Sequence, residues 1–168
     1  MLDLTPPQAY TVLLVLAAPI GLWVAWSDMK TMRIPNSAVC ALVGVFAVAG
    51  FLVIPFEFWI WRWASLAGVL AVGFLLNAFF GVGAGDAKFA AAAAPFVAQN
   101  LAETQLVLML FAAWLLLAFA GHRLARAIPA VRRAASDWKS WTSAKFPMGL
   151  ALVGTLLSYL AIKAAGLL

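Results

Sequence analysis

Long runs without a charged side chain constrain this sequence more than any other feature. Residues 9–26 form the first such run and contain no Asp, Glu, Lys or Arg. A helix of roughly 20 apolar residues is long enough to cross the hydrocarbon core of a bilayer. The whole chain is 66% hydrophobic and 10% charged, whereas a soluble domain is about half apolar and about one quarter charged. The runs therefore predict an integral membrane protein.

Polar and proline-containing breaks divide the chain into six apolar segments. We predict an all-α bundle of six transmembrane helices that forms a single domain over residues 1–168. The predicted spans are residues 9–26, 37–54, 63–80, 87–103, 104–120 and 146–162. The apolar part of the fourth segment is short, so a helix that crosses the membrane there must begin near Asp86 and run to about Glu103. This requirement draws Asp86 towards the membrane.

The basic residues between the predicted spans fall mostly on one side. Nine lie on one side and two, Arg62 and Lys163, on the other, which indicates the cytosolic side by the positive-inside rule. The nine are Lys30, Arg33, Lys88, Arg123, Arg126, Arg132, Arg133, Lys139 and Lys145. We therefore expect both termini outside the cytosol, and Asp28 and Asp86 at the cytosolic face.

Residues 122–145 are the longest polar segment and carry an apolar stripe. The stripe residues recur at spacings of four and three, which is typical of one helix face; they are Leu124, Ile128, Val131, Ala135 and Trp138. Because basic residues lie off this stripe, the pattern predicts a helix over residues 125–139 on the cytosolic surface of the bilayer, in contact with anionic lipid. Pro129 either breaks this helix or starts it.

Charge and cysteine content exclude several other partners. A net charge of +5 would suit nucleic acid, but the basic residues fall between apolar runs and are better explained as topology signals. Cys40 is the only cysteine, which excludes an intramolecular disulfide and a multi-cysteine zinc site. We predict no nucleic-acid partner, no metal and no cofactor.

The glycine-rich sequence GVGAGDAK at residues 81–88 has apolar sequence on both sides. An ionisable residue near membrane depth is costly and is a candidate for function, with a plain helix-to-helix turn as the alternative. Two interpretations of Lys88 stay open: an ion pair that stabilises ionised Asp86, or extension to the cytosolic headgroups. The second is favoured, because a permanent ion pair would oppose proton sharing by Asp86.

Asp28 and Asp86 stand apart from the other four acidic residues. Only these two lie at a helix end on the same predicted side with apolar sequence close by. Two neighbouring carboxylates do not both ionise easily, so they share one proton. The ionised member can take a proton from water, and the protonated member can give one to a leaving amine. This pair predicts amide hydrolysis without a metal, with Gly83 and Gly85 leaving the backbone open to an extended substrate.

These residues carry a resemblance to a known family. The sequence GAGD at residues 83–86 matches the GxGD signature of intramembrane aspartic proteases, and with Lys88 it fits the GxGDxK form of prepilin peptidases. Asp28 with Arg33 and the following Ile-Pro-Asn resembles the segment around that family's first aspartate, and residues 145–149 resemble the start of its last helix. The chain thus resembles the type IV prepilin (leader) peptidases over nearly its whole length. It looks most like the minimal, stand-alone form found with Flp (tight-adherence) pili.

The resemblance implies an aspartic endopeptidase of the bacterial inner membrane. Such an enzyme removes a basic leader from prepilins or pilin-like precursors, which carry a leader and an N-terminal hydrophobic helix, at the cytosolic membrane face. It implies Asp28 and Asp86 as the catalytic pair. It also implies supporting roles for Gly83, Gly85, Lys88, Arg33, Pro35, Asn36, Pro147 and Gly149. The extra cytosolic domain with paired cysteines of the large members is missing, so N-methylation is not implied, and archaeal preflagellin peptidases share the aspartate pair.

Two other function classes fit a small polytopic membrane protein. A proton-coupled transporter could use the paired aspartates, but it should carry them nearer the midplane and show related halves, and no internal symmetry is evident. A non-catalytic subunit of a secretion machine is the third reading, which nothing beyond the membrane class supports.

Overall fold

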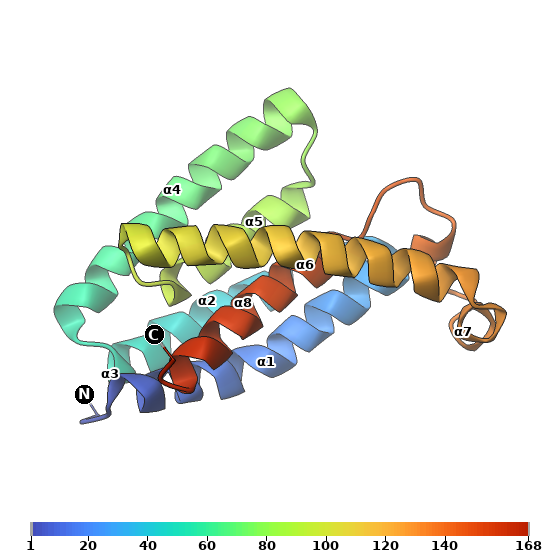
Figure 1. Ribbon diagram of the computed structural model, residues 1–168. Coiled ribbons are helices and arrows are strands. Elements are labelled where there is room, and N and C mark those ends of the chain that lie inside the picture. The colour runs from blue at the N-terminus through green and yellow to red at the C-terminus, as the bar shows by residue number, and fades with distance from the viewer. Residues whose placement is uncertain (1, 168) are drawn as a thin grey trace.

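The computed structural model describes residues 2–167, and every regular element within them is a helix (Figure 1). Three long helices are α1 (Pro6–Thr31), α4 (Phe56–Phe80) and α6 (Leu101–Ala127). A fourth continuous helix, Asn36–Val53, joins α2 (Asn36–Val45), a π-helical turn (Phe46–Gly50) and α3 (Phe51–Val53). These four are long and apolar enough to cross a membrane. The prediction of an all-α polytopic membrane protein is confirmed.

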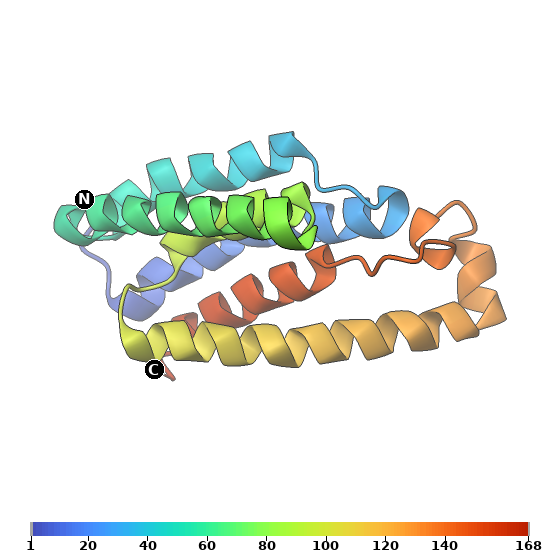
Figure 2. The ribbon, with the colours of Figure 1, turned by 90° about the horizontal axis from the view of Figure 1, so that it is seen from above.

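The remaining elements are short. They are α5 (Ala84–Ala93) with a 3₁₀ turn (Ala94–Phe96), α7 (Pro129–Ala134), a second 3₁₀ turn (Lys139–Trp141) and α8 (Gly149–Ala164). The six predicted spans correspond in order to α1, α2–α3, α4, α5, α6 and α8. Both described chain ends lie at one end of the molecule and α7 lies at the other, as both views show (Figures 1 and 2).

The predicted fourth span, residues 87–103, is wrong as a single helix. The α5 helix and its 3₁₀ turn end at Phe96, and Val97 is extended (φ −89°, ψ 136°). The α6 helix then begins at Leu101, because Asn100 Oδ1 accepts a hydrogen bond from the Glu103 N–H at 2.9 Å, an N-cap that fixes the helix start. Residues 101–103 therefore belong to α6, which also continues seven residues beyond the predicted end at 120.

Two other predicted boundaries also move. The α4 helix starts at Phe56, so residues 56–62, which lie between two predicted spans, are helical after the Pro55 N-cap. The α8 helix starts at Gly149 instead of residue 146. A proline disfavours α conformation in the residue before it, which explains why Phe146 stays outside the helix ahead of Pro147.

The predicted single helix over residues 125–139 is also wrong. The α6 helix runs to Ala127, Ile128 is extended (φ −87°, ψ 112°), and Pro129 starts the six-residue α7. A proline cannot continue a helix without losing a hydrogen bond, so the break falls where Pro129 stands. Beyond α7 the Trp138 ring packs edge-on against Trp26 of α1 at 5.2 Å between centroids. The segment thus folds back onto the end of α1.

The centre of the bundle is built around α1 and α8. Leu13, Ala17 and Val24 of α1 are fully buried, and so are Tyr159 and Leu160 of α8. In contrast, α4 and α6 expose most of their apolar side chains; Phe79 of α4 is 76% exposed and Leu116 of α6 is 72% exposed. Such surfaces are the ones that lipid covers in a membrane protein.

Candidate active site

Asp28 lies in the last turns of α1 and is 5% exposed. Its Oδ2 accepts a hydrogen bond of 2.7 Å from the N–H of Gly149, the first residue of α8. The first N–H groups of a helix lack partners within the helix and attract negative charge. A methyl group at Gly149 would lie 2.9 Å from Asp28 Oδ2 and 3.0 Å from Asp28 Cβ. Only glycine therefore lets the carboxylate approach this helix start so closely.

Asp86 lies in the first turn of α5, which follows a glycine turn. Gly81 ends α4 in the left-handed region at φ 68°, a conformation that glycine adopts without strain. Gly83 is the N-cap of α5, and a methyl group there would overlap Asp86 Oδ2. A methyl group at Gly85 would lie 3.3 Å from Ile34 Cβ. The glycines therefore make room for the carboxylate and for close packing of α5 on the α1–α2 turn.

The two carboxylates line one cavity of about 320 Å³ where α1, α5 and the start of α8 meet. Of the other predicted site residues, Arg33, Asn36, Gly83, Gly85 and Lys88 also line it. Pro35 is the N-cap of α2, Pro147 is fully buried, and Gly149 acts through its N–H to Asp28. These last three do not line the cavity.

The environment of Asp86 changes its acidity. Asp86 lies outside the four long apolar helices. The pKa of its carboxyl is raised to about 6, chiefly by burial and secondly by the Asp28 carboxylate, against a lowering by the Lys145 ammonium. A carboxyl with such a pKa can hold a proton near neutral pH, as an acid catalyst must.

Lys88 makes a contact that neither sequence interpretation foresaw. Its ammonium is exposed and donates a hydrogen bond of 3.2 Å to Asn36 Oδ1. No ion pair joins Lys88 to Asp86 among residues 2–167. Lys88 therefore ties α5 to the start of α2, on the rim of the cavity.

The cavity also contains residues that sequence reasoning missed. They are Met32, Ile34, Ala84, Lys145, Phe146 and Met148. Lys145 could have been identified from the sequence, since it precedes the Pro-x-Gly motif on the predicted cytosolic side. No sequence feature indicated Met32. It ends α1 in the left-handed region (φ 57°, ψ 36°), where its N–H donates to the Asp28 carbonyl at 2.8 Å. Methionine rarely adopts this conformation, and such strained residues cluster at functional sites.

A second cavity, of about 390 Å³, lies between α4, α5, α6 and α8. No Asp, Glu, His, Lys or Arg side chain lines it. Within the described residues 2–167, no cluster of three or more His, Cys, Asp or Glu side chains is placed to hold a metal ion. Of these two cavities, the first is therefore the one lined by carboxyl groups.

Comparison with protein families gives a match that includes both aspartates. The model of the type IV leader peptidase family matches residues 14–122, which is more than half of the chain. The chain belongs to the type IV leader peptidase family. No curated protein and no solved structure matches it. As a family member the protein is a leader-peptidase-like protease, and its family implies a prepilin-type substrate.

Proposed function

We propose that this leader peptidase is an aspartic endopeptidase with Asp28 and Asp86 as its catalytic pair. The observation that carries the proposal is that these two carboxylates, 58 positions apart in the sequence, line one cavity. Two carboxyl groups around one water are sufficient for general acid–base hydrolysis of a peptide bond. No step needs a nucleophilic side chain.

We assign the ionised state to Asp28 and the protonated state to Asp86. The N–H at the start of α8 faces Asp28, and a helix N-terminus favours an anion. Among the described residues no N–H donates to the Asp86 carboxyl, whereas the Gly149 N–H donates to Asp28 at 2.7 Å, so Asp86 holds the shared proton. Asp28 then takes a proton from the water that attacks the scissile carbonyl, and Asp86 gives its proton to the departing amine. The arrangement ends with the proton on the opposite aspartate, and exchange with water restores the first state.

We propose that the cavity faces the cytosol at the inner membrane, with both termini on the other side. Three basic residues, Arg33, Lys88 and Lys145, line the cavity. The two basic residues predicted on the other side, Arg62 and Lys163, are engaged inside the protein at the far end of α5. The remaining basic residues therefore give a strong positive-inside bias towards the cavity end.

We further propose that the substrate is a Flp-type prepilin or pilin-like precursor, and that residues 1–168 form one integral-membrane peptidase domain. The position of the aspartates also weighs against a transporter, because they lie at helix ends on one side instead of at the midplane.

Cleavage of a purified Flp-type precursor in liposomes tests this function. The protein should shorten the precursor at a single peptide bond, and mass spectrometry of both fragments should place the cut between the leader and the hydrophobic helix. A precursor that stays intact at equimolar enzyme, while the liposomes show proton-coupled solute uptake, would replace the peptidase by a transporter.

A further inference from the structure

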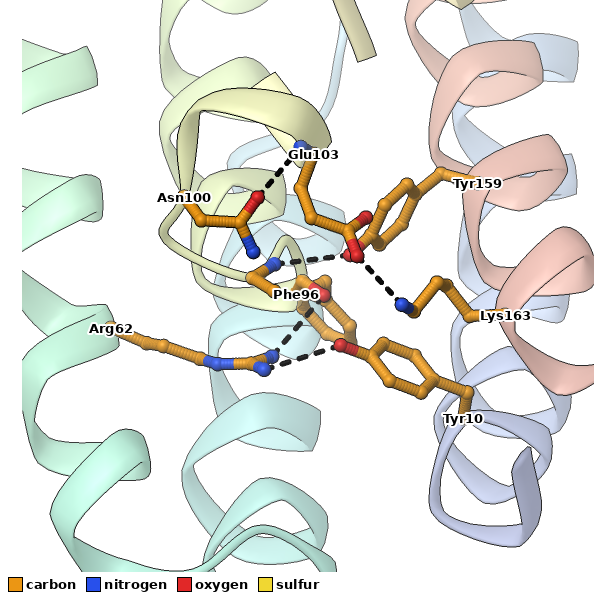
Figure 3. Close-up of polar contacts among 8 residues, drawn as sticks. Tyr10, Arg62, Phe96, Asn100, Glu103, Tyr159 and Lys163 are labelled. Carbon is orange, nitrogen blue, oxygen red and sulfur yellow. Dashed lines mark hydrogen bonds and ion pairs between the residues drawn. The ribbon is translucent and has the colours of Figure 1, made fainter. Parts of the chain in front are cut away.

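A buried polar cluster lies at the far end of α5, about ten residues from Asp86 (Figure 3). Its members come from four other helices: Tyr10 of α1, Arg62 of α4, Glu103 of α6, and Tyr159 and Lys163 of α8. We call these five residues the α5 anchor. None of them lines the cavity that holds the aspartates.

The anchor meets α5 where that helix stops short. The α5 helix and its 3₁₀ turn contain 13 residues, which span ~20 Å at 1.5 Å per residue, whereas the hydrocarbon core is ~30 Å thick. The last carbonyls of a helix have no partner within the helix, and lipid offers none. Side chains of the protein must supply the missing hydrogen bonds.

Arg62 supplies them. Its Nη1 lies 3.4 Å from both the Pro95 and the Phe96 carbonyl oxygens, and its Nη2 donates to the Tyr10 hydroxyl at 3.2 Å. Tyr159 completes the cap, because its hydroxyl accepts a bond of 3.0 Å from the Ala98 N–H. One guanidinium and one phenol thus hold both sides of the turn that ends α5.

The rest of the anchor holds these two groups in place. Lys163 Nζ lies 2.6 Å from Glu103 Oε1 and 5.4 Å from the centre of the Tyr10 ring. The Tyr10 and Tyr159 rings meet edge-on with centroids 6.1 Å apart. Through these contacts α1, α6 and α8 fix the position at which α4 presents Arg62.

Arg62 is a buried cation whose main partners are carbonyl groups. It is 9% exposed, and no carboxylate lies within ion-pair distance of it among residues 2–167. Burying a charge is costly unless polar groups compensate it. Here the compensation is the negative end of α5, so the energy of the buried charge depends on where α5 ends.

At the opposite end of α5, the side-chain hydrogen bond to another helix among the described residues is the exposed one from Lys88 to Asn36 at 3.2 Å, and water competes for both of its groups. This end follows an exposed glycine turn, and Gly83 gives α5 no side-chain cap. Close packing of Gly73 against Ala87 sets the distance between α4 and α5, but this contact contains no hydrogen bond that would fix the position along the helix axis. The hydrogen bonds at Phe96 therefore determine the axial position of α5, and with it the depth of Asp86.

We propose that Arg62 is a positioning residue for Asp86, acting through the length of α5. The proposal rests on the proposed function only in that Asp86 is taken as catalytic. It predicts that loss of the Arg62 contacts lets α5 shift relative to the α1–α2 turn while the rest of the bundle keeps its packing.

A disulfide reporter tests the shift independently of activity. In a Cys40→Ser background, Ile34→Cys with Gly85→Cys joins α5 to the α1–α2 turn, since a Cβ at Gly85 would lie 3.3 Å from Ile34 Cβ, near the ~3.8 Å that disulfides prefer. The control pair Gly21→Cys with Val153→Cys joins α1 to α8, where a Cβ at Gly21 would lie 3.0 Å from Val153 Cγ1.

With Arg62 present, both pairs should oxidise rapidly in membranes. Arg62→Met should slow the α5 pair about tenfold, the change expected for ~1.4 kcal/mol of lost preference for the aligned state, and leave the control pair unchanged. Arg62→Lys keeps the charge but has one nitrogen donor group, so its α5 pair should oxidise at a rate between those of the Arg62 and Arg62→Met proteins. Equal oxidation of the α5 pair in all three proteins overturns the proposal, and so does equal slowing of both pairs, which would mean general loosening.

Precursor cleavage gives the second measurement, in the protein without added cysteines. Because a misplacement of 1 Å can cost ~10²-fold in rate, Arg62→Met should lower kcat by about that factor with KM little changed. Arg123→Met, an exposed arginine on α6, is the matched control. Cleavage that survives Asp86→Asn would refute the proposed function and leave the reporter result standing; unchanged kcat in Arg62→Met would refute the positioning role alone.

Discussion

At the residue scale, each aspartate is paired with a glycine that leaves room for it. Gly149 faces Asp28 and Gly83 faces Asp86, and in both places a methyl group would meet a carboxylate oxygen. The sequence analysis named Gly149 only through the family resemblance, and Gly83 also for an open backbone next to the substrate. Their physical role could not be predicted, because Gly149 and Asp28 are 121 residues apart and their contact depends on how α8 docks on α1.

Gly149→Ala should separate this role from a general effect of glycine. The added methyl group would press on Asp28 at 2.9 to 3.0 Å, and a displacement near 1 Å predicts a loss of ~10²-fold in cleavage rate. Gly121→Ala is the control, since a Cβ there meets nothing within 4 Å and alanine favours a helix by ~1 kcal/mol. Equal cleavage by the two variants would show that Gly149 does not position Asp28.

The pH dependence of cleavage follows from the assignment of the shared proton. Asp86 has a pKa raised to about 6, so it is protonated below that pH and loses its proton as pH rises through it. If Asp86 is the acid, the rate should fall on the alkaline side with a midpoint near pH 6. The measurement is kcat between pH 5 and pH 8 in liposomes. A rate that keeps rising to pH 8 would mean that Asp86 is not the proton donor.

At the scale of elements, the sequence predicted which segments are helices better than where they end. Apolar runs located every long helix, because burial in lipid needs length and little else. The fourth span failed because it was assumed that each apolar run crosses the membrane, whereas α5 ends inside the protein on Arg62. The α6 start was readable in principle, since Asn100 precedes Glu103 by three residues, a common N-cap pattern.

The basic segment after α6 is a second element whose position can be tested. Arg132 and Arg133 of α7 are exposed, and anionic lipid attracts basic residues near its surface by ~1 kcal/mol each. We expect residues 125–139 to be better protected from hydrogen exchange in anionic than in zwitterionic bilayers, and Arg132→Gln with Arg133→Gln to reduce the difference. Equal protection in both bilayers would place this segment away from the membrane surface.

At the scale of the whole molecule, the side of the membrane that holds the active site depends on where the termini lie. The aspartate cavity lies at the end of α1 and the start of α8, whereas the termini adjoin the start of α1 and the end of α8. A cytosolic active site therefore requires the termini outside the cytosol. The bias of basic residues could be read from the sequence alone. The role of Arg62 and Lys163 in the anchor could not be read from the sequence, because their partners come from α1, α6 and the turn after α5.

Cysteine labelling tests this orientation. In a Cys40→Ser background, Leu2→Cys should react with an impermeant thiol reagent added outside intact cells, and Ser136→Cys should react only after the membrane is opened. Both positions are exposed in the structure, so access to the reagent depends on the side of the membrane. The reverse pattern would place the aspartate cavity outside the cytosol.

The most direct test of the account is precursor cleavage by Asp28→Asn, Asp86→Asn and the double variant, each at matched expression. Each single change removes one half of the proton transfer, and general acid–base terms are worth ~10²–10⁴ in rate. Because the two carboxyls act as a unit, the double variant should be little worse than either single one. Glu57→Gln, an exposed carboxylate at the start of α4, should keep most activity. Near-parental cleavage by either single aspartate variant would contradict the two-aspartate mechanism.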